Sequence, residues 1–364
     1  MHFIDHGKRF EQIDFIKGAR VQYIDVCKGL AILLVVLGHL QIPSLLYRSI
    51  FAFHIYAFFF LSGVTFKVKA GQKFCDFLKD GAKRLLIPYL FFAFAWDITN
   101  MAAQLYTAKT FDFSAIGILK NIADVLCGDL FIESSASIGP SWFLLALFIV
   151  RATFWLMAKF TKNNFYLIGI ICIALFVLGS LCRGMSFLPF KIFSTLTAFF
   201  FIYCGYVSKT NLMRLKEKKI WILFLASVIA FGATFFAATS AERTLLLTSN
   251  VLPSNIFLVL AGGIFGCIGL ICLAMSVEKT RFLSALLAFY GVNSLIIMGI
   301  HSEISLFFLL IFKLVGVAYL PKIVLVMIIT MILSIPFSIL LNKYLPFMVG
   351  RGRSRSAHQT YRPV

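Results

Sequence analysis

The chain has 364 residues, of which 60% are hydrophobic and 13% are charged, and its mean hydropathy is +0.93. A soluble domain is about half apolar and a quarter charged, so this composition excludes an ordinary soluble protein. The formal net charge of +19 would suggest a nucleic-acid partner in a soluble protein. Here the basic residues lie between long apolar runs, where they orient membrane helices, and no nucleic-acid partner is expected.

Apolar runs of about 18 residues or more are long enough to cross a bilayer. They predict an all-α integral membrane protein, a bundle of about ten transmembrane helices. The predicted helices are 24–43, 47–66, 85–105, 141–158, 164–182, 192–208, 220–239, 252–276, 282–302 and 322–346. Residues 303–316 are apolar but short, and they could extend the ninth helix, re-enter the membrane or lie at its surface.

Lysine and arginine are unevenly distributed between the segments that join these helices. With the N-terminus in the cytoplasm, the inside segments hold roughly three times as many of the 34 basic residues as the outside segments. Leaving out one helix would exchange inside and outside for every later segment and so invert the bias. The bias therefore supports the helix count and predicts that both termini lie in the cytoplasm. We expect a cytoplasmic tail at 1–22, a membrane domain of about ten helices at 23–347 and a basic cytoplasmic tail at 348–364. The scattered cysteines lack metal-like spacing, and no metal is expected.

The first predicted helix contains three ionisable residues, Asp25, Lys28 and His39. Eleven residues separate Lys28 from His39, so both lie on one face of the helix, about 16 Å apart along its axis. Asp25 lies on the same face and can hold Lys28. Lys28 could simply anchor the helix end by extending its ammonium group to the membrane surface. His39 is harder to explain in this way, because an imidazole inside a bilayer usually faces a cavity and can exchange protons near neutral pH.

Two further histidines are predicted at the same depth as His39, in the outer half of the membrane. His54 lies in the second helix, and His301 lies near the outer end of the ninth, beside Glu303 and with Asn293 deeper. These histidines could instead only link neighbouring helices through hydrogen bonds.

Other charged and aromatic residues are candidates for substrate contacts. Lys83 and Arg84 end a basic cytoplasmic loop and could hold phosphates or face anionic lipid. Asp97 and Arg151 lie near the midplane of adjacent helices, and we expect an ion pair between them. At the outer start of the fourth helix, Ser141 and Trp142 could contact a sugar, although tryptophan is also common as an interfacial anchor.

Five sequence blocks resemble the acyltransferase-3 family of membrane acyltransferases, and within it the fucose 4-O-acetylase-like branch. They are YIDVCKGLAILLVVLGHL (23–40), FHIYAFFFLSG (53–63), KRLLIPYL (83–90), PSWFLLALF (140–148) and YGVNSLIIMGIH (290–301). The first block is the most specific, because the family pairs a basic residue with a histidine eleven positions later. Here these residues are Lys28 and His39, with lysine where many members have arginine.

The resemblance implies ten core helices and acyl transfer to a glycan or lipid-linked sugar, commonly in a bacterial inner membrane. It implies that His39 is catalytic, that Lys28 and Arg84 serve the CoA side, and that the WFL block and the late histidine support the acceptor side. We therefore expect acetyl-CoA as acyl donor, a membrane-embedded site and no metal. A different class stays open on the residues alone: a transporter or glycan flippase that uses the intramembrane histidines, Asp97 and Arg151.

The full set of site residues expected from the sequence falls into three groups. His39, His54 and His301 are expected to be catalytic, Lys28, Arg84, Lys83 and Asp25 to bind the donor, and Ser141, Trp142, Glu303 and Asn293 to bind the acceptor.

Overall fold

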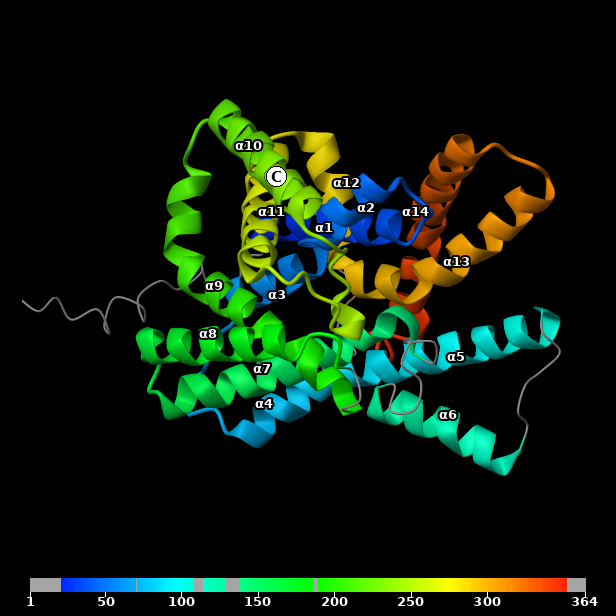
Figure 1. Ribbon diagram of the computed structural model, residues 1–364, viewed down its shortest axis with the longest axis horizontal. Helices are drawn as coiled ribbons and strands as arrows, with labels where there is room; N and C mark the ends of the chain where they lie inside the picture. The colour runs from blue at the N-terminus through cyan, green and yellow to red at the C-terminus, as the bar shows by residue number, and fades with distance from the viewer. Residues whose placement is uncertain (1–20, 70, 108–113, 129–137, 186–188, 352–364) are drawn as a thin grey trace, which may run out of the picture.

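The structure is a computed structural model that describes residues 21–351 except 70, 108–113, 129–137 and 186–188. This part of the chain is built from α-helices and short helical turns (Figure 1). The helices are α1 (Gln22–Gly38), α2 (Ser44–Phe51), α3 (His54–Val64), α4 (Phe74–Gly81), α5 (Ile87–Thr107), α6 (Ala115–Cys127), α7 (Trp142–Phe160), α8 (Phe165–Leu181), α9 (Ile192–Lys216), α10 (Ile220–Ser240), α11 (Ile256–Val277), α12 (Arg281–Val292), α13 (Ser294–Leu314) and α14 (Tyr319–Tyr344).

The predicted all-α membrane fold is confirmed. In the described residues, eight helical stretches are long and apolar enough to cross a membrane, and α8 and α12 are shorter apolar helices. Large apolar side chains point outward along these helices, for example Ile170, Leu181 and Phe236. Such exposure would be costly in water and is the expected surface of a protein surrounded by lipid.

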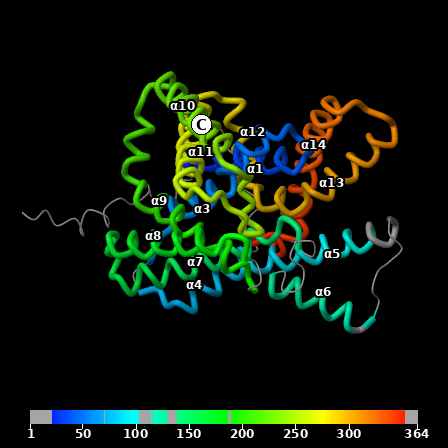
Figure 2. Tube along the Cα trace, in the orientation of Figure 1, coloured from blue at the N-terminus to red at the C-terminus, as the bar shows by residue number. Residues whose placement is uncertain are grey.

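Helix α1 lies at the centre of the bundle (Figure 2). It packs against α3, α11, α12 and α13, and its residues Ala31, Ile32 and Val36 have no exposed surface. A helix that is covered on most sides can hold polar residues away from lipid. This placement gives the ionisable residues of the first predicted helix a protein environment.

Two glycines bring α1 and α12 into direct backbone contact. A Cβ atom at Gly29 would lie 2.0 Å from the carbonyl oxygen of Leu287, and a Cβ at Gly291 would lie 1.7 Å from that of Asp25. Only a residue without a Cβ fits at either position. In membranes such small-residue contacts let two backbones approach closely, and the resulting van der Waals contact holds the helices together.

The contact also fixes the register between α1 and the α12–α13 segment. Gln22 donates a hydrogen bond to Ser284 at one end, and the rings of His39 and His301 meet at the other. The members of both pairs are 262 residues apart, so the two segments run parallel without slipping along the whole of α1. The register therefore places the end of α1 against α13.

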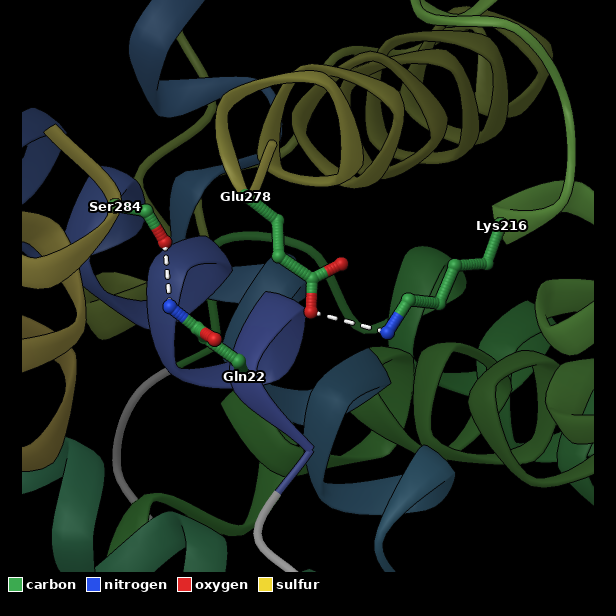
Figure 3. A network of polar contacts seen from close by, with 4 residues as sticks. All are labelled: Gln22, Lys216, Glu278 and Ser284. Atoms are coloured by element: carbon green, nitrogen blue, oxygen red, sulfur yellow. Dashed lines mark hydrogen bonds and ion pairs between the residues drawn. The ribbon is translucent and has the colours of Figure 1, made fainter. Parts of the chain in front are cut away.

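A polar cluster closes the end of the bundle at which α1 begins (Figure 3). Gln22 Nε2 lies 2.7 Å from Ser284 Oγ, and Lys216 Nζ lies 3.0 Å from Glu278 Oε1. The Lys216 ammonium also lies 5.6 Å from the centroid of the Tyr23 ring. These contacts tie the first turn of α1 to α12 and link the ends of α9 and α11.

The first two predicted helices are shorter or broken in the structure. The predicted helix 24–43 ends at Gly38, so His39 is its C-terminal cap rather than an interior residue. The predicted helix 47–66 is two helices, α2 and α3, separated at Ala52 and Phe53. The predictions of continuous helices here were wrong. An apolar run does not reveal where a helix breaks when contacts from elsewhere in the fold satisfy the freed backbone groups.

The ninth predicted helix, 282–302, is also divided. It breaks at Asn293, and residues 303–314 belong to α13, so the undecided segment extends this helix. His301 and Glu303 therefore lie well inside a 21-residue helix rather than near its outer end, as the sequence had suggested. The break moves the membrane-spanning stretch toward the C-terminus.

Two regions that were expected to be loops are helical. Residues 74–81 form α4 and continue through a π-helical turn, Ala82–Leu86, into α5. Residues 115–127 form α6, whose residues Ile116, Leu119 and Leu126 are exposed apolar side chains. An amphipathic helix with an uncovered apolar face is typical of a segment lying in the membrane interface.

The glycine contact between α1 and α12 predicts a position-specific cost. We expect Gly291→Ala to lower the thermal unfolding midpoint of the purified protein, because the added methyl meets a backbone carbonyl. The free energy of unfolding should fall by about 1–3 kcal/mol. Gly232→Ala is the matched control, since a Cβ at Gly232 has no atom within 4 Å. Equal midpoints for the two variants would contradict this account of the packing.

Candidate active site

The structure brings His39 and His301 into contact. His39 caps the C-terminus of α1, and His301 is the eighth residue of α13. Their ring centroids are 4.9 Å apart and the rings are nearly perpendicular, at 79°. The close approach follows from the parallel register of α1 and α12–α13 described above.

His54 is joined to this pair through Phe51. His54 is the first residue of α3, immediately after the break that follows α2. The Phe51 ring lies 4.7 Å from the His54 ring and 6.4 Å from the His39 ring, measured between centroids. The three histidines inside the predicted membrane domain thus form one cluster, built from the ends of α1 and α3 and the middle of α13.

Each histidine bonds through Nδ1 to a backbone carbonyl of its own chain segment. His39 Nδ1 lies 2.8 Å from the Val35 oxygen, and His54 Nδ1 lies 2.8 Å from the Ile50 oxygen. His301 Nδ1 lies 2.8 Å from the oxygen of Met298. A carbonyl oxygen only accepts, so Nδ1 carries the hydrogen, and in the neutral imidazole Nε2 bears the lone pair. Every ring of the cluster therefore presents a basic nitrogen on its far side.

The three rings differ in their access to a ligand. His54 and His301 are buried, with 1% and 0% of their surface exposed, whereas His39 is an exposed residue. His301 Nε2 already accepts a hydrogen bond from Ser302 Oγ at 3.2 Å. His39 is therefore the member of the cluster whose basic nitrogen is best placed to meet a substrate.

Glu303 adds an acidic group two residues after His301. Its side chain is half-buried, and its Oε2 atom is buried without a hydrogen-bond partner in the described part of the chain. A buried carboxylate oxygen without a donor is unfavourable. A substrate hydroxyl is one donor that could satisfy it.

Asp25 and Lys28 lie on α1 as expected. The helix is continuous from Gln22 to Gly38, so Lys28 is about 16 Å along the axis from His39, on the same face. Asp25 is buried and Lys28 is half-buried. The structure thus preserves the stripe from a basic residue to the histidine cluster.

Lys83 and Arg84 are exposed on the π-helical turn between α4 and α5. π-Helical turns inside α-helices occur frequently at functional sites. The backbone of Arg84 is approached by Gly350, where a Cβ would lie 2.7 Å from the Arg84 oxygen. The chain after α14 therefore packs on the donor-side candidate, and Val349 is buried there.

The predicted ion pair between Asp97 and Arg151 is wrong. Within the described residues Arg151 forms no ion pair, and its guanidinium donates to Ser62 Oγ at 2.7 Å. Arg151 lies near Arg84, a like charge, while Asp97 lies near the carboxylate of Asp124. Adjacency of their helices in sequence did not bring the two charges to the same face.

Asn293 occupies the break between α12 and α13. Its amide oxygen accepts hydrogen bonds from Asn342 Nδ2 at 2.9 Å and from an Arg351 guanidinium nitrogen at 3.0 Å. Its amide nitrogen donates to the Phe289 oxygen. These protein partners give Asn293 a role in closing the helix break, and the acceptor contact expected from the sequence stays a prediction.

Ser141 and Trp142 are buried at the start of α7. The short turn Gly139–Ser141 packs against α5 and α13, and the Trp96 ring lies directly against Gly139. The block around Trp142 is thus linked to the helix that carries His301. Contact of Ser141 or Trp142 with an acceptor remains a prediction.

A cavity of about 780 Å³ lies beside α1, α2, α10 and α11. Its lining is apolar except for Ser49 and Thr234, and it includes none of the three histidines. A cavity of this composition cannot supply acid–base chemistry. The histidine cluster therefore remains the candidate site.

Sequence reasoning missed several polar residues of this region. Ser302 bonds to His301, Asn342 and Arg351 bond to Asn293, and Lys209 donates to the Phe66 oxygen at the end of α3. Ser302 was the most accessible to prediction, because it follows a histidine that the sequence had already singled out.

The described residues form a helical membrane bundle in which three histidines cluster, and comparison with known proteins gives the family of the chain. Residues 21–342 match the acyltransferase-3 family, whose model describes an acyltransferase domain, and the chain belongs to this family. The family resemblance expected from the sequence is confirmed, and the chain is a multi-pass membrane protein of this family.

One characterised relative is similar over part of its length. The nodulation protein NolL of Sinorhizobium fredii is 30% identical over 178 residues, which are 45% of this chain and 43% of NolL. The chain thus spans less than half the length of this relative. No solved structure matches the chain.

The hydrogen bonds of Asn293 predict a structural effect of its removal. We expect Asn293→Ala to destabilise the protein by about 1–3 kcal/mol, since Asn342 and Arg351 lose a shared acceptor. Thermal unfolding in detergent measures this effect. Asn211→Ala, at an exposed position of α9, is the control and should leave the midpoint unchanged; a midpoint for Asn293→Ala equal to that of the control would refute the structural role.

Proposed function

We propose that the protein moves an acetyl group from acetyl-CoA to a hydroxyl of a sugar in a surface polysaccharide or a lipid-linked glycan. The observation that carries this proposal is the exposed His39, whose Nε2 bears a lone pair at the end of a central helix and beside His301. Family membership supports the acyl-transfer chemistry. Acetyl-CoA as donor and a sugar as acceptor follow from the resemblance of the sequence blocks.

In the proposed reaction His39 acts as general base. A hydroxyl is a weak nucleophile near neutral pH until its proton is removed, and Nε2 of His39 would take that proton. The hydroxyl oxygen then attacks the thioester carbonyl, and a tetrahedral intermediate forms. Its collapse breaks the carbon–sulfur bond, and the imidazolium returns the proton to the departing CoA thiolate. The products are the acetyl ester and CoA, and His39 is regenerated.

An acetyl-histidine intermediate is the alternative route. The Nε2 lone pair of His39 could attack the thioester directly and pass the acetyl group to the acceptor in a second step. Both routes use the same nitrogen and need the same Nδ1 hydrogen bond to Val35. His54 and His301 would keep the cluster polar and in place.

The donor would approach from the cytoplasm. Its phosphates would lie near Lys28, Lys83 and Arg84, with Asp25 holding Lys28, and its pantetheine arm would follow α1 toward His39. The continuous helix from Lys28 to His39 supports this path of about 16 Å. The acceptor would arrive from the opposite side, where Glu303, Ser141 and Trp142 are the candidate contacts. Asn293, also a candidate, lies deeper, at the break between α12 and α13.

The proposal includes a bacterial cytoplasmic membrane as the location, with both termini in the cytoplasm. The bias of basic residues toward the inside segments supports the orientation. Transport by the same histidines and charges is the competing class. It is disfavoured by membership of an acyltransferase family.

The proposal predicts that His39→Ala abolishes turnover. We expect CoA release from acetyl-CoA in the presence of candidate glycan acceptors to fall by a factor of about 100 or more, since general acid–base catalysis supplies 10²–10⁴-fold. The assay uses protein in nanodiscs, with Gln41→Ala, an exposed neighbour, as the control. A folded His39→Ala protein with wild-type turnover would exclude His39 as the base.

A further inference from the structure

Basic side chains gather around Phe66, just beyond the C-terminal end of α3. The Arg151 guanidinium lies 5.6 Å from the centroid of the Phe66 ring, and Lys209 Nζ donates a hydrogen bond to the Phe66 carbonyl oxygen. Arg84 is close enough to Arg151, and Lys67 close enough to Lys209, for their charges to repel. These residues come from α7, α9, the π-helical turn and the end of α3.

Three members of the cluster have no ion-pair partner in the described part of the chain. These are Arg84, Arg151 and Lys209. Like charges held together in a helix bundle repel each other and lose hydration, which costs free energy. A bound anion would offset both costs.

Arg151 also has spare hydrogen-bonding capacity. A guanidinium carries five N–H donors, and the described structure commits one nitrogen of Arg151, to Ser62 Oγ. The half-buried side chain keeps its other donors available. A planar donor fork of this kind matches the paired oxygens of a phosphate.

We propose that Arg151, Lys209 and Arg84 form the site that binds the phosphate groups of the acyl-CoA donor. The inference rests on the proposed function and adds two donor-binding residues, Arg151 and Lys209, that the sequence did not indicate. Helix α3 rises by about 15 Å from His54 to Val64, and Phe66 lies just beyond its end. This rise is close to the 16 Å between Lys28 and His39 on α1. An acyl-CoA whose phosphates lie near Phe66 would therefore place its thioester near the histidine cluster.

The test compares binding of CoA by wild-type protein and variants in nanodiscs of zwitterionic lipid, with pantetheine as a probe that lacks the phosphates. We expect Arg151→Gln to weaken CoA binding about tenfold or more, in line with the loss of charge-assisted hydrogen bonds. Arg151→Lys should retain part of the affinity, and pantetheine binding should not change. Lys159→Gln, which removes an exposed charge from the same helix, is the matched control.

Ser62→Ala separates a ligand contact from a structural one. It removes the hydrogen-bond partner of Arg151 and leaves the charge, so it should keep CoA affinity near that of the wild type. Two results would overturn the site. One is wild-type CoA affinity in a folded Arg151→Gln protein. The other is a loss of CoA affinity in Ser62→Ala and Lys159→Gln as large as that in Arg151→Gln. Failure of the wild type to bind CoA at all would instead overturn the proposed function, and with it this inference.

Discussion

The close contact between the backbones of α1 and α12 is the constraint on which the candidate site depends. Gly29 and Gly291 leave no space for a side chain between the two helices, so the helices cannot slide or rotate independently. The parallel register that results carries through the break at Asn293 into α13. His39 meets His301 because of packing set about ten residues earlier in each segment. In lipid, where apolar faces gain little by associating, such backbone contact is a principal source of specificity.

Helix ends and breaks inside the bundle give the site its polarity. His39 lies where α1 stops and His54 lies where α3 begins, and both rings satisfy Nδ1 with a carbonyl of the preceding turn. Non-helical backbone within a membrane protein persists only where other groups satisfy it. At the break between α12 and α13, Asn293 donates to the Phe289 carbonyl oxygen and Arg351 donates to the Val292 carbonyl oxygen. Asn342 donates to the Asn293 side chain and holds it in place. The same interruptions that cost helical hydrogen bonds therefore supply the fixed orientation that acid–base chemistry requires.

Much of this arrangement was predictable from residue spacing. The eleven-residue interval from Lys28 to His39 required one helical face, and the depth of His54 and His301 indicated that they would lie near His39. The breaks at Phe53 and Asn293 were not predictable, because both interrupt apolar runs without proline and are stabilised by contacts distant in sequence. Arg151 was misassigned for a related reason. Its helix was placed correctly, but the rotation of that helix about its axis depends on Ser62 of α3 and on Phe66, just beyond the end of α3.

The chain after α14 contacts two parts of the molecule that the histidines do not touch, the π-helical turn and the junction of α12 and α13. Val349 is buried with Phe92 and Ile296, Gly350 lies against the Arg84 backbone, and Arg351 bonds at the Asn293 break. This short segment acts as a brace between the π-helical turn and the α12–α13 junction. One substitution in this segment would therefore disturb both the backbone around Arg84 and the start of the helix that carries His301, although the two places are far apart in the sequence.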